Sequence, residues 1–266
     1  MLDLLKAILA AAGVLGIMGF VFGLLLAFAS KFFFVKEDER KGQIISVLPS
    51  ANCGGCGYAG CAAYADAILA GEAEPTLCNA GGQEIADQIA NIMGVDAGTV
   101  VKRYARIRCN GNFDVAKTKY QYVGIEDCRA SNRLQGGQML CKYGCVGLGT
   151  CASVCANNAI KLHNGVAVVE RELCGGCGKC AEICPKKIID MIPETATYYV
   201  GCSSKDKGAL TKKACSVGCI GCKLCEKTCQ FGAITVKDNI AVIDQEKCVG
   251  CGLCAEKCPA KIIERI

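Results

Sequence analysis

The chain opens with a long uninterrupted apolar stretch. Residues 7–30 (AILAAAGVLGIMGFVFGLLLAFAS) include no charged side chain, and about 20 residues suffice for a helix to cross the hydrocarbon core of a bilayer. Ala27-Phe28-Ala29 matches the cleavage pattern of a signal peptide, but the apolar region of a signal peptide has only about 7–15 residues and follows a basic segment. The pattern therefore predicts a retained transmembrane helix within residues 1–32.

The charges that flank this stretch predict its orientation. One basic residue, Lys6, precedes it, and the acidic residues at 37–39 count little in the positive-inside rule. The excess of positive charge after the stretch places the bulk of the chain on the cytoplasmic side. The basic residues that follow at once are Lys31, Lys36, Arg40 and Lys41.

Shorter patterns follow the anchor. Apolar residues recur with helical spacing in 62–70 and 83–93, which predicts two short helices. Residues 157–170 (NNAIKLHNGVAVVE) and 231–244 (FGAITVKDNIAVID) each alternate around a pair of turn residues, Asn164-Gly165 and Asp238-Asn239. Alternation around such a turn predicts a β-hairpin. The expected fold class is α+β, with small elements after a transmembrane helix.

Cysteine is the most unusual part of the composition. The chain has 24 cysteines and 32 glycines in 266 residues, and no tryptophan. Either disulfides or metal centres could hold such a chain together. Cytosolic thiols stay reduced, so the predicted orientation favours metal centres.

The first group of cysteines has the spacing C-x2-C-x4-C-x16-C and comprises Cys53, Cys56, Cys61 and Cys78. Four thiolates are what a [4Fe-4S] cluster requires, and the glycines between them let backbone amides turn toward the sulfurs. A structural zinc site with four cysteines is the alternative interpretation.

The remaining cysteines contain an internal repeat, the strongest signal in the chain. Adding 74 to nine cysteine positions gives nine further cysteines, which indicates a tandem copy without an insertion. The pairs are Cys128 and Cys202, Cys141 and Cys215, Cys145 and Cys219, Cys151 and Cys225, Cys155 and Cys229, Cys174 and Cys248, Cys177 and Cys251, Cys180 and Cys254, and Cys184 and Cys258.

In the second copy, each run has the spacing C-x2-C-x2-C-x3-C of two-cluster bacterial ferredoxins, in which the fourth cysteine of one run ligates the other cluster. This exchange predicts two [4Fe-4S] clusters. Their ligands are Cys219, Cys222, Cys225 and Cys258 for one cluster, and Cys248, Cys251, Cys254 and Cys229 for the other.

The first copy departs from this pattern because Leu148 stands where the second copy has Cys222. The missing ligand must come from elsewhere, and Cys141 is the nearest candidate in the sequence. The predicted ligands are therefore Cys141, Cys145, Cys151 and Cys184 for one cluster, and Cys174, Cys177, Cys180 and Cys155 for the next.

These assignments give five [4Fe-4S] clusters and leave four cysteines over. The spare residues are Cys109, Cys128, Cys202 and Cys215. A sixth cluster, a zinc ion and plain thiols are all compatible with their spacing.

The combination of an anchor, the C-x2-C-x4-C-x16-C group and paired ferredoxin runs resembles the B subunit of the Rnf complex. The resemblance covers essentially the whole chain. It implies a single-pass protein of the bacterial inner membrane that accepts electrons from reduced soluble ferredoxin. It further implies that the electrons pass to membrane subunits of an ion-translocating ferredoxin:NAD oxidoreductase, while NAD is reduced at a flavin-bearing subunit.

Other functions remain open at this stage. The chain could be an electron-transfer subunit of another membrane enzyme, such as a hydrogenase or a formate dehydrogenase, or a scaffold that stores clusters.

The sequence shows no acid–base pair, activated nucleophile or phosphate-binding loop, so we expect no catalytic residue and no substrate site of its own. We expect no nucleic-acid partner. The formal net charge of +5 and the basic segment KDKGALTKK at 205–213 favour an acidic protein partner.

The predicted organisation has four parts. They are the anchor at 1–32, a 4Fe-4S domain at 33–108, a first ferredoxin-like module at 109–193 and a second at 194–266.

Overall fold

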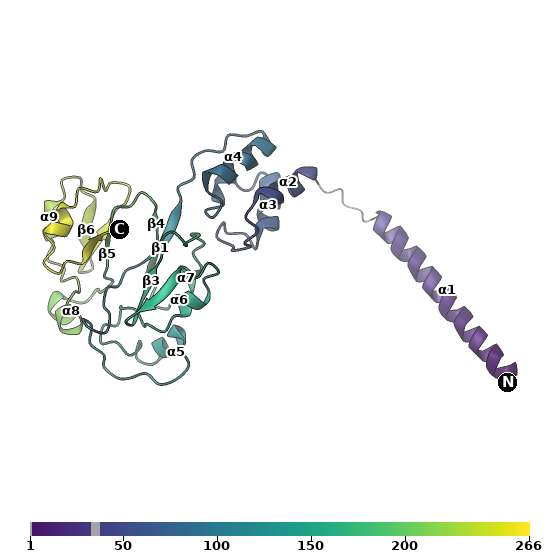
Figure 1. The fold of residues 1–266 in the computed structure, drawn as a ribbon, viewed down its shortest axis with the longest axis horizontal. Helices are drawn as coiled ribbons and strands as arrows, with labels where there is room; N and C mark the ends of the chain where they lie inside the picture. Colours follow the sequence, from purple (N-terminus) through teal and green to yellow (C-terminus); the bar gives the residue numbers. More distant parts are fainter. Residues whose placement is uncertain (1, 33–37) are drawn as a thin grey trace. The chain divides into compact units, whose positions relative to one another are not determined.

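The computed structural model describes the backbone of residues 2–32 and 38–266, and the side chains of residues 12–31 and 38–266. Lys36, one of the basic residues on which the predicted orientation depends, lies outside the described residues. The chain forms two compact units, residues 1–42 and residues 43–266 (Figure 1).

The first unit contains helix α1 (Leu2–Phe32). Its segment Ala12–Lys31 has a mean hydropathy of 2.3 and no buried side chain. Among the described residues, this is the one helix that is long and apolar enough to cross a membrane. The predicted transmembrane segment is thus present as a continuous helix.

A small helical domain follows, and its first helix, α2 (Glu39–Val47), spans the boundary between the two units at residue 42. Helices α2, α3 (Cys61–Leu69) and α4 (Gly82–Met93), with the 3-10 turn η1 (Pro75–Leu77), surround a core that includes Ile44, Tyr64 and Ile89. The Tyr64 hydroxyl donates a hydrogen bond of 2.7 Å to the carbonyl of Glu74, which ties the segment before η1 to α3. The two predicted helices are confirmed within one residue, whereas α2 was not predicted.

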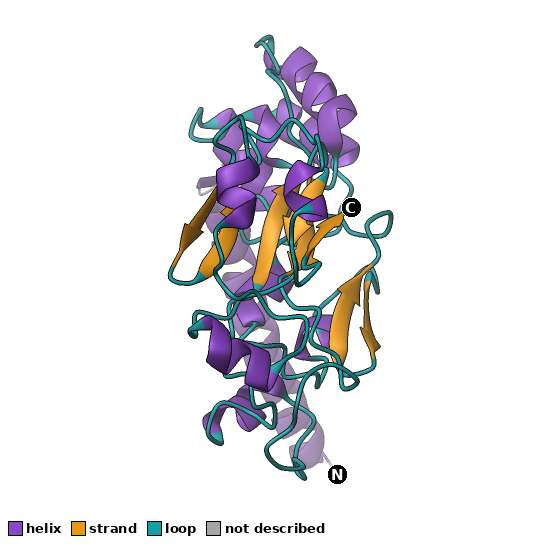
Figure 2. Ribbon diagram, turned by 90° about the vertical axis from the view of Figure 1, so that its left-hand side faces the viewer, coloured by secondary structure: helices purple, strands orange, loops and turns teal. Residues whose placement is uncertain are grey.

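The first ferredoxin-like module is closed by strands that are far apart in the sequence. Strand β1 (Arg103–Ile107) pairs antiparallel with β4 (Ile189–Pro193), and β2 (Ile160–His163) pairs with β3 (Val166–Val169) (Figure 2). Three short helices carry cysteines between these strands: α5 (Cys128–Arg133), α6 (Thr150–Ser153) and α7 (Lys179–Ile183).

The second module repeats this arrangement. Strand β5 (Tyr198–Val200) pairs with β8 (Ile263–Arg265), and β6 (Ile234–Lys237) pairs with β7 (Ile240–Ile243). The helices are α8 (Gly208–Ala214), α9 (Leu224–Thr228) and α10 (Leu253–Glu256).

Both predicted hairpins are confirmed. Asn164 and Gly165 have φ values of 44° and 80°, and Asp238 and Asn239 have values of 50° and 63°. Positive φ at both central residues is what a two-residue hairpin turn of type I′ requires.

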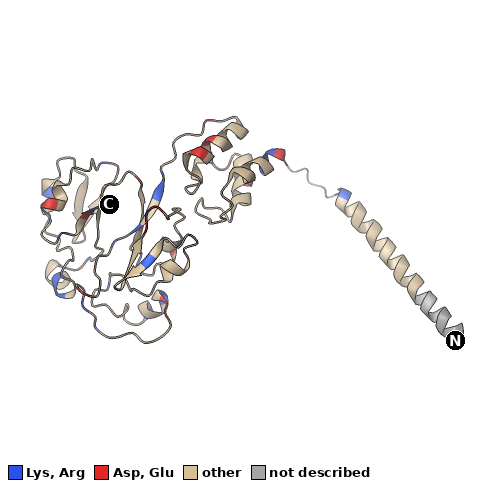
Figure 3. Cartoon of the chain, in the orientation of Figure 1, with Lys and Arg blue, Asp and Glu red and all other residues tan. Residues whose placement is uncertain are grey.

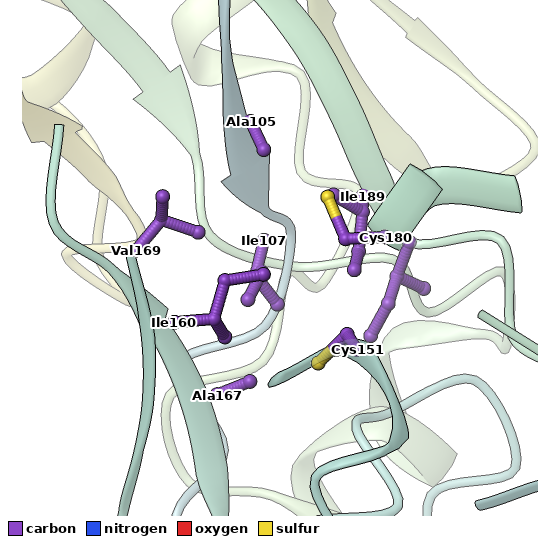
Figure 4. Close-up of a cluster of buried hydrophobic side chains, with 9 residues drawn as sticks. Ala105, Ile107, Cys151, Ile160, Ala167, Val169, Cys180 and Ile189 are labelled. Atoms are coloured by element: carbon purple, nitrogen blue, oxygen red, sulfur yellow. The ribbon is translucent and has the colours of Figure 1, made fainter. Parts of the chain in front are cut away.

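The core of each module is small and includes sulfur atoms. In the first module, Ile107, Ile160 and Ile189 pack around Cys151 and Cys180 (Figure 4). The second module has an equivalent cluster of aliphatic side chains with Cys219 and Cys225. Domains of this size bury too little apolar surface to be very stable alone, so groups that bind to these thiols contribute to folding.

The strand pairing corrects one part of the predicted repeat. Ile107 faces Ile189 and Val200 faces Ile263, and the amides of Arg108 and Gly201 donate to the carbonyls of Ile188 and Ile262. Cys109 lies two residues after the end of β1, and Cys202 lies two residues after the end of the equivalent strand β5. Cys202 therefore corresponds to Cys109 and not to Cys128.

The two modules also differ in length, because Cys109 and Cys141 are 32 residues apart whereas Cys202 and Cys215 are 13 apart. The prediction of a copy without an insertion is thus wrong: the first module has 19 additional residues, which include α5. Strand β1 also lies before residue 109, where the first module was predicted to begin.

Candidate iron-sulfur centres

The four cysteines of the N-terminal group lie around one cavity. Cys53, Cys56, Cys61 and Cys78 line a cavity of about 390 Å³. Burial raises the pKa of Cys78, and charge on the other three thiols raises it further, which places all four within electrostatic reach. The side-chain oxygen of Asn52 accepts a hydrogen bond of 2.9 Å from the amide of Cys61 and so fixes the start of α3.

This N-terminal group lies directly against the first ferredoxin-like module. A β-carbon added to Gly55 would lie 2.7 Å from the Cα atom of Cys177, so only glycine permits this approach. Asn79 joins the same two regions, because its side chain donates to the carbonyls of Arg103 and Gly175 at 2.9 and 3.1 Å.

The structure also brings together the predicted set of that module to which Cys177 belongs. Its members are Cys155, Cys174, Cys177 and Cys180. Burial raises the pKa of Cys180 to about 11, with further contributions from charge on Cys174, Cys177 and Cys155. Backbone amides point at two of these sulfurs: Ala105 donates to Cys174 at 3.4 Å and Ala159 to Cys155 at 3.3 Å. Such amide-to-sulfur bonds stabilise thiolate ligands and tune cluster potential.

The next set differs from the prediction in one residue. A cavity of about 350 Å³ is lined by Cys145, Cys151 and Cys184, as expected, but the fourth cysteine there is Cys128. The sequence spacing assigns Cys141 to this set, but Cys141 lies along a different cavity. Three of the spare cysteines, Cys109, Cys202 and Cys215, also line that cavity.

Cys128 reaches this position because it begins α5, within the additional residues of the first module. Asp127 accepts hydrogen bonds from the amides of Arg129 and Ala130 at the start of this helix. The hydroxyl of Thr150 accepts a hydrogen bond of 2.7 Å from the amide of Cys128. The additional segment thus places Cys128 where the short loop with Leu148 offers no thiol.

Burial also affects the protonation of this set. Burial raises the pKa of Cys151 to about 12, and the charges of Cys145, Cys128 and Cys184 raise it further. Cysteine binds metal as the thiolate, so cluster binding must release the protons of these thiols.

The second module brings together all four predicted residues of one set and three of the other. Cys219, Cys222, Cys225 and Cys258 line a cavity of about 350 Å³, and charge on Cys248 and Cys251 raises the pKa of Cys254 after burial. Burial raises the pKa of Cys229, but hydrogen bonds from the four backbone amides of residues 231–234 lower it by more. The pKa of Cys229 therefore lies below its usual value.

The spacing of the thiols bears on the kind of metal centre. A zinc ion bound at about 2.3 Å by four sulfurs would hold those sulfurs close together. Among the side chains that the structure describes, those of residues 12–31 and 38–266, no three of His, Cys, Asp or Glu converge in a way that suits a single ion. Sets of four cysteines that surround one cavity without converging on a single ion fit a larger group such as a four-iron cube.

Comparison with protein families agrees with this chemistry. A model named FeS, which describes an Fe-S cluster, matches residues 48–80. A 4Fe-4S binding domain matches residues 167–190, and a 4Fe-4S dicluster domain matches residues 218–262. The fold and the sites thus define an iron-sulfur protein with [4Fe-4S] domains of ferredoxin type and an N-terminal apolar helix.

Three relatives extend the likeness over nearly the whole chain. The B subunit of the Na(+)-translocating ferredoxin:NAD(+) oxidoreductase complex of Acetobacterium woodii is 44% identical over 98% of this chain and 78% of the relative. The B subunit of the ion-translocating oxidoreductase complex of Methanosarcina acetivorans is 42% identical over 94% and 96%. The B subunit of the proton-translocating ferredoxin:NAD(+) oxidoreductase complex of Clostridium ljungdahlii is 41% identical over 95% and 90%. The chain belongs to this family, the B subunits of the Rnf-type ion-translocating oxidoreductases.

The reassignment of Cys128 can be tested by counting intact [4Fe-4S] clusters in the purified full-length chain with Mössbauer spectroscopy and iron analysis. We expect Cys128→Ala to remove one cluster, because the cavity then lacks a fourth thiolate. Cys128→Ala combined with Cys145→Ala should remove no more than either change alone. Cys128→Ala combined with Cys177→Ala should remove two. A full set of clusters in Cys128→Ala would contradict the assignment.

Lys186 supports a second prediction, because it lines the cavity of Cys128 and its ammonium group donates to the carbonyls of Gly136 and Lys142. The equivalent residue of the second module is Ala260. A nearby positive charge favours the more negative, reduced form of a cluster. We therefore expect Lys186→Ala to lower the reduction potential of this centre in a redox titration.

Lys161→Ala is the control for Lys186→Ala, since it removes a solvent-exposed lysine of the same module. It should leave the potential almost unchanged. An unchanged or raised potential in Lys186→Ala, with the full number of clusters, would refute the electrostatic role of Lys186.

Proposed function

We propose that this chain accepts electrons from reduced soluble ferredoxin and relays them to membrane subunits of an ion-translocating ferredoxin:NAD oxidoreductase complex. In this proposal NAD is reduced at a separate flavin-bearing subunit, and this chain has no substrate-converting site of its own. Two relatives carry the words ferredoxin:NAD(+) oxidoreductase in their names, which supports the assignment.

The observation that carries the proposal is the uneven exposure of the cysteines. All 24 lie in the described residues, and only Cys222 and Cys251 are exposed. Both belong to the second module. A donor protein can therefore approach the two predicted centres of that module more closely than it can approach those of the first.

The charge beside these cysteines suits an acidic donor. Lys223 follows Cys222 directly, and Lys227 lies on α9; both side chains are exposed. The basic segment at 205–213 adds Lys212 and Lys213 on α8 (Figure 3). Clustered positive charge raises the rate at which an acidic protein encounters a surface.

The bound clusters would supply one-electron redox chemistry, and the residues of the chain would hold them in sequence and limit access by water. The contact between Gly55 and Cys177 supports a path from the first module to the N-terminal group. That group follows α1 in the chain through α2, so we propose that electrons leave toward the membrane subunits from there.

The proposed side of the membrane is the cytoplasmic one, where soluble ferredoxin is available. The support comes from the sequence, in which basic residues follow the apolar helix and only Lys6 precedes it.

We predict that ferredoxin-driven reduction of the chain slows as ionic strength rises, because salt screens the attraction between donor and basic surface. The double change Lys223→Gln and Lys227→Gln should lower the second-order rate at low salt by up to roughly tenfold and should weaken its salt dependence. Stopped-flow absorbance measures both effects. Lys161→Gln, in the other module, should have little effect, and a rate that is indifferent to salt would rule out steering.

The proposed sidedness predicts the outcome of protease treatment. Trypsin added to inside-out membrane vesicles should degrade the body of the chain, because its lysines face outward there. The same treatment of right-side-out vesicles should leave the chain intact on an immunoblot. Digestion in the right-side-out vesicles alone would show the opposite orientation.

A further inference from the structure

A cavity between the two ferredoxin-like modules is lined by three of the four spare cysteines, Cys109, Cys202 and Cys215, and by Cys141, which the structure separates from its predicted set. It has a volume of about 420 Å³, and its lining also includes three hydroxyl side chains, apolar side chains and glycines. Cys145 borders it as well, but this residue also lies with Cys128, Cys151 and Cys184 at the neighbouring cavity. All four thiols are free, and Cys202 and Cys215 are buried. The volume is similar to that of the cavities surrounded by the other cysteine sets.

These four residues form two equivalent pairs, one from each module. Cys109 and Cys202 each lie two residues after equivalent strands, β1 and β5. Each sulfur accepts a hydrogen bond from the amide of an equivalent cysteine, Cys145 at 3.3 Å and Cys219 at 3.4 Å.

The other pair is Cys141 and Cys215, which are 74 residues apart. Their carbonyls accept hydrogen bonds from the amides of Gly144 and Gly218, again 74 residues apart, at 3.4 and 3.3 Å. The cavity therefore lies on an approximate twofold relation between the modules, and each module contributes the same two thiols.

Reciprocal hydrogen bonds hold the modules together beside this cavity. The amide of Asn110 donates to the carbonyl of Gly201 at 2.9 Å, and the hydroxyl of Ser203 donates to the carbonyl of Arg108 at 2.7 Å. Since Asn110 corresponds to Ser203 and Arg108 to Gly201, the two bonds join equivalent residues, although the donor is a backbone amide in one and a side-chain hydroxyl in the other. The four thiols thus lie on a defined interface.

Glycines keep the space around the sulfurs open. A β-carbon on Gly111 would lie 3.4 Å from the sulfur of Cys215 and 3.6 Å from that of Cys109. A β-carbon on Gly144 would lie 3.6 Å from the sulfur of Cys141. Side chains at these positions would crowd the region that a cluster bound to the four thiols would need.

We infer that Cys109, Cys141, Cys202 and Cys215 bind a sixth [4Fe-4S] cluster that both modules share. The site has the same chemistry as the other sets, with four thiols around one cavity and amide donors directed at sulfur. The spare set predicted from the sequence contained Cys128, and the structure replaces that residue with Cys141.

The position of the site indicates its role, and this step rests on the proposed function. Cys109 accepts a hydrogen bond from Cys145, a predicted ligand in the first module, and Cys202 accepts one from Cys219, a predicted ligand in the second. The shared cluster therefore joins the two modules. Held by these four thiols, it would accept one electron from a reduced cluster of the second module, which would be oxidised, and would pass that electron to an oxidised cluster of the first.

The ligand set can be tested by cluster counting in the full-length chain, purified without oxygen. The unaltered chain should contain about six intact [4Fe-4S] clusters and about 24 iron atoms. Cys109→Ala, Cys215→Ala and their combination should each lose the same single cluster. Cys141→Ala combined with Cys145→Ala should lose two, because these neighbours belong to different sites.

Other counts would overturn the inference. About five clusters and 20 iron atoms in the unaltered chain would deny the sixth site, and this measurement does not depend on whether any variant folds. One zinc ion per chain that disappears in Cys215→Ala would show a zinc site instead. A loss of two clusters in Cys109→Ala combined with Cys215→Ala would separate the residues into different sites.

Stopped-flow reduction of Cys215→Ala tests the bridging role. Clusters of the second module should be reduced by ferredoxin at the unaltered rate, while those of the first module should be reduced more slowly. Equal rates in both modules would refute the bridge. If ferredoxin reduced no cluster even in the unaltered chain, the proposed donor would be wrong, while the cluster count would still decide the sixth site.

Discussion

The constraint on which this structure depends is the need to gather four thiols from separate segments around one group. The apolar cores are small, and their buried members include cysteines such as Cys151 and Cys225. Side chains that begin a helix, follow a strand or end a loop must therefore meet around each cavity. Because metal binding to such thiols is coupled to folding, the same contacts that carry electrons also stabilise the tertiary structure.

This constraint explains how the first module tolerates the loss of one ligand in its compact run. Leu148 replaces a thiol, and a segment with no counterpart in the second module supplies Cys128 at the same cavity. Cys141 faces the other module, as does its equivalent Cys215 in the module whose run is complete. The position of this pair therefore does not depend on the difference at Leu148.

Local patterns predicted much of the fold. The apolar helix, helices α3 and α4, both hairpins and the four cysteines of the N-terminal group follow from composition and spacing over short distances. The pairing of β1 with β4 was not predicted, because it joins residues more than 80 positions apart. A coincidence of spacing concealed that Cys128, and not Cys141, belongs with Cys145, Cys151 and Cys184. Cys128 lies 74 residues before Cys202, but the structural counterpart of Cys202 is Cys109. Chain spacing carries no information about which side of an inserted loop faces a cavity.

The approximate twofold relation has a further consequence at Lys186 and Ala260. Two identical subunits in a dimer would have to carry the same side chain at both positions. Here the two halves belong to one polypeptide, so each position is free to diverge. Lys186 lines one cavity, whereas the second cavity has Ala260 at that position and Lys223 at a different one. Covalent fusion of the halves thereby allows an energy difference between symmetric sites, and such a difference can give a chain of carriers a preferred direction.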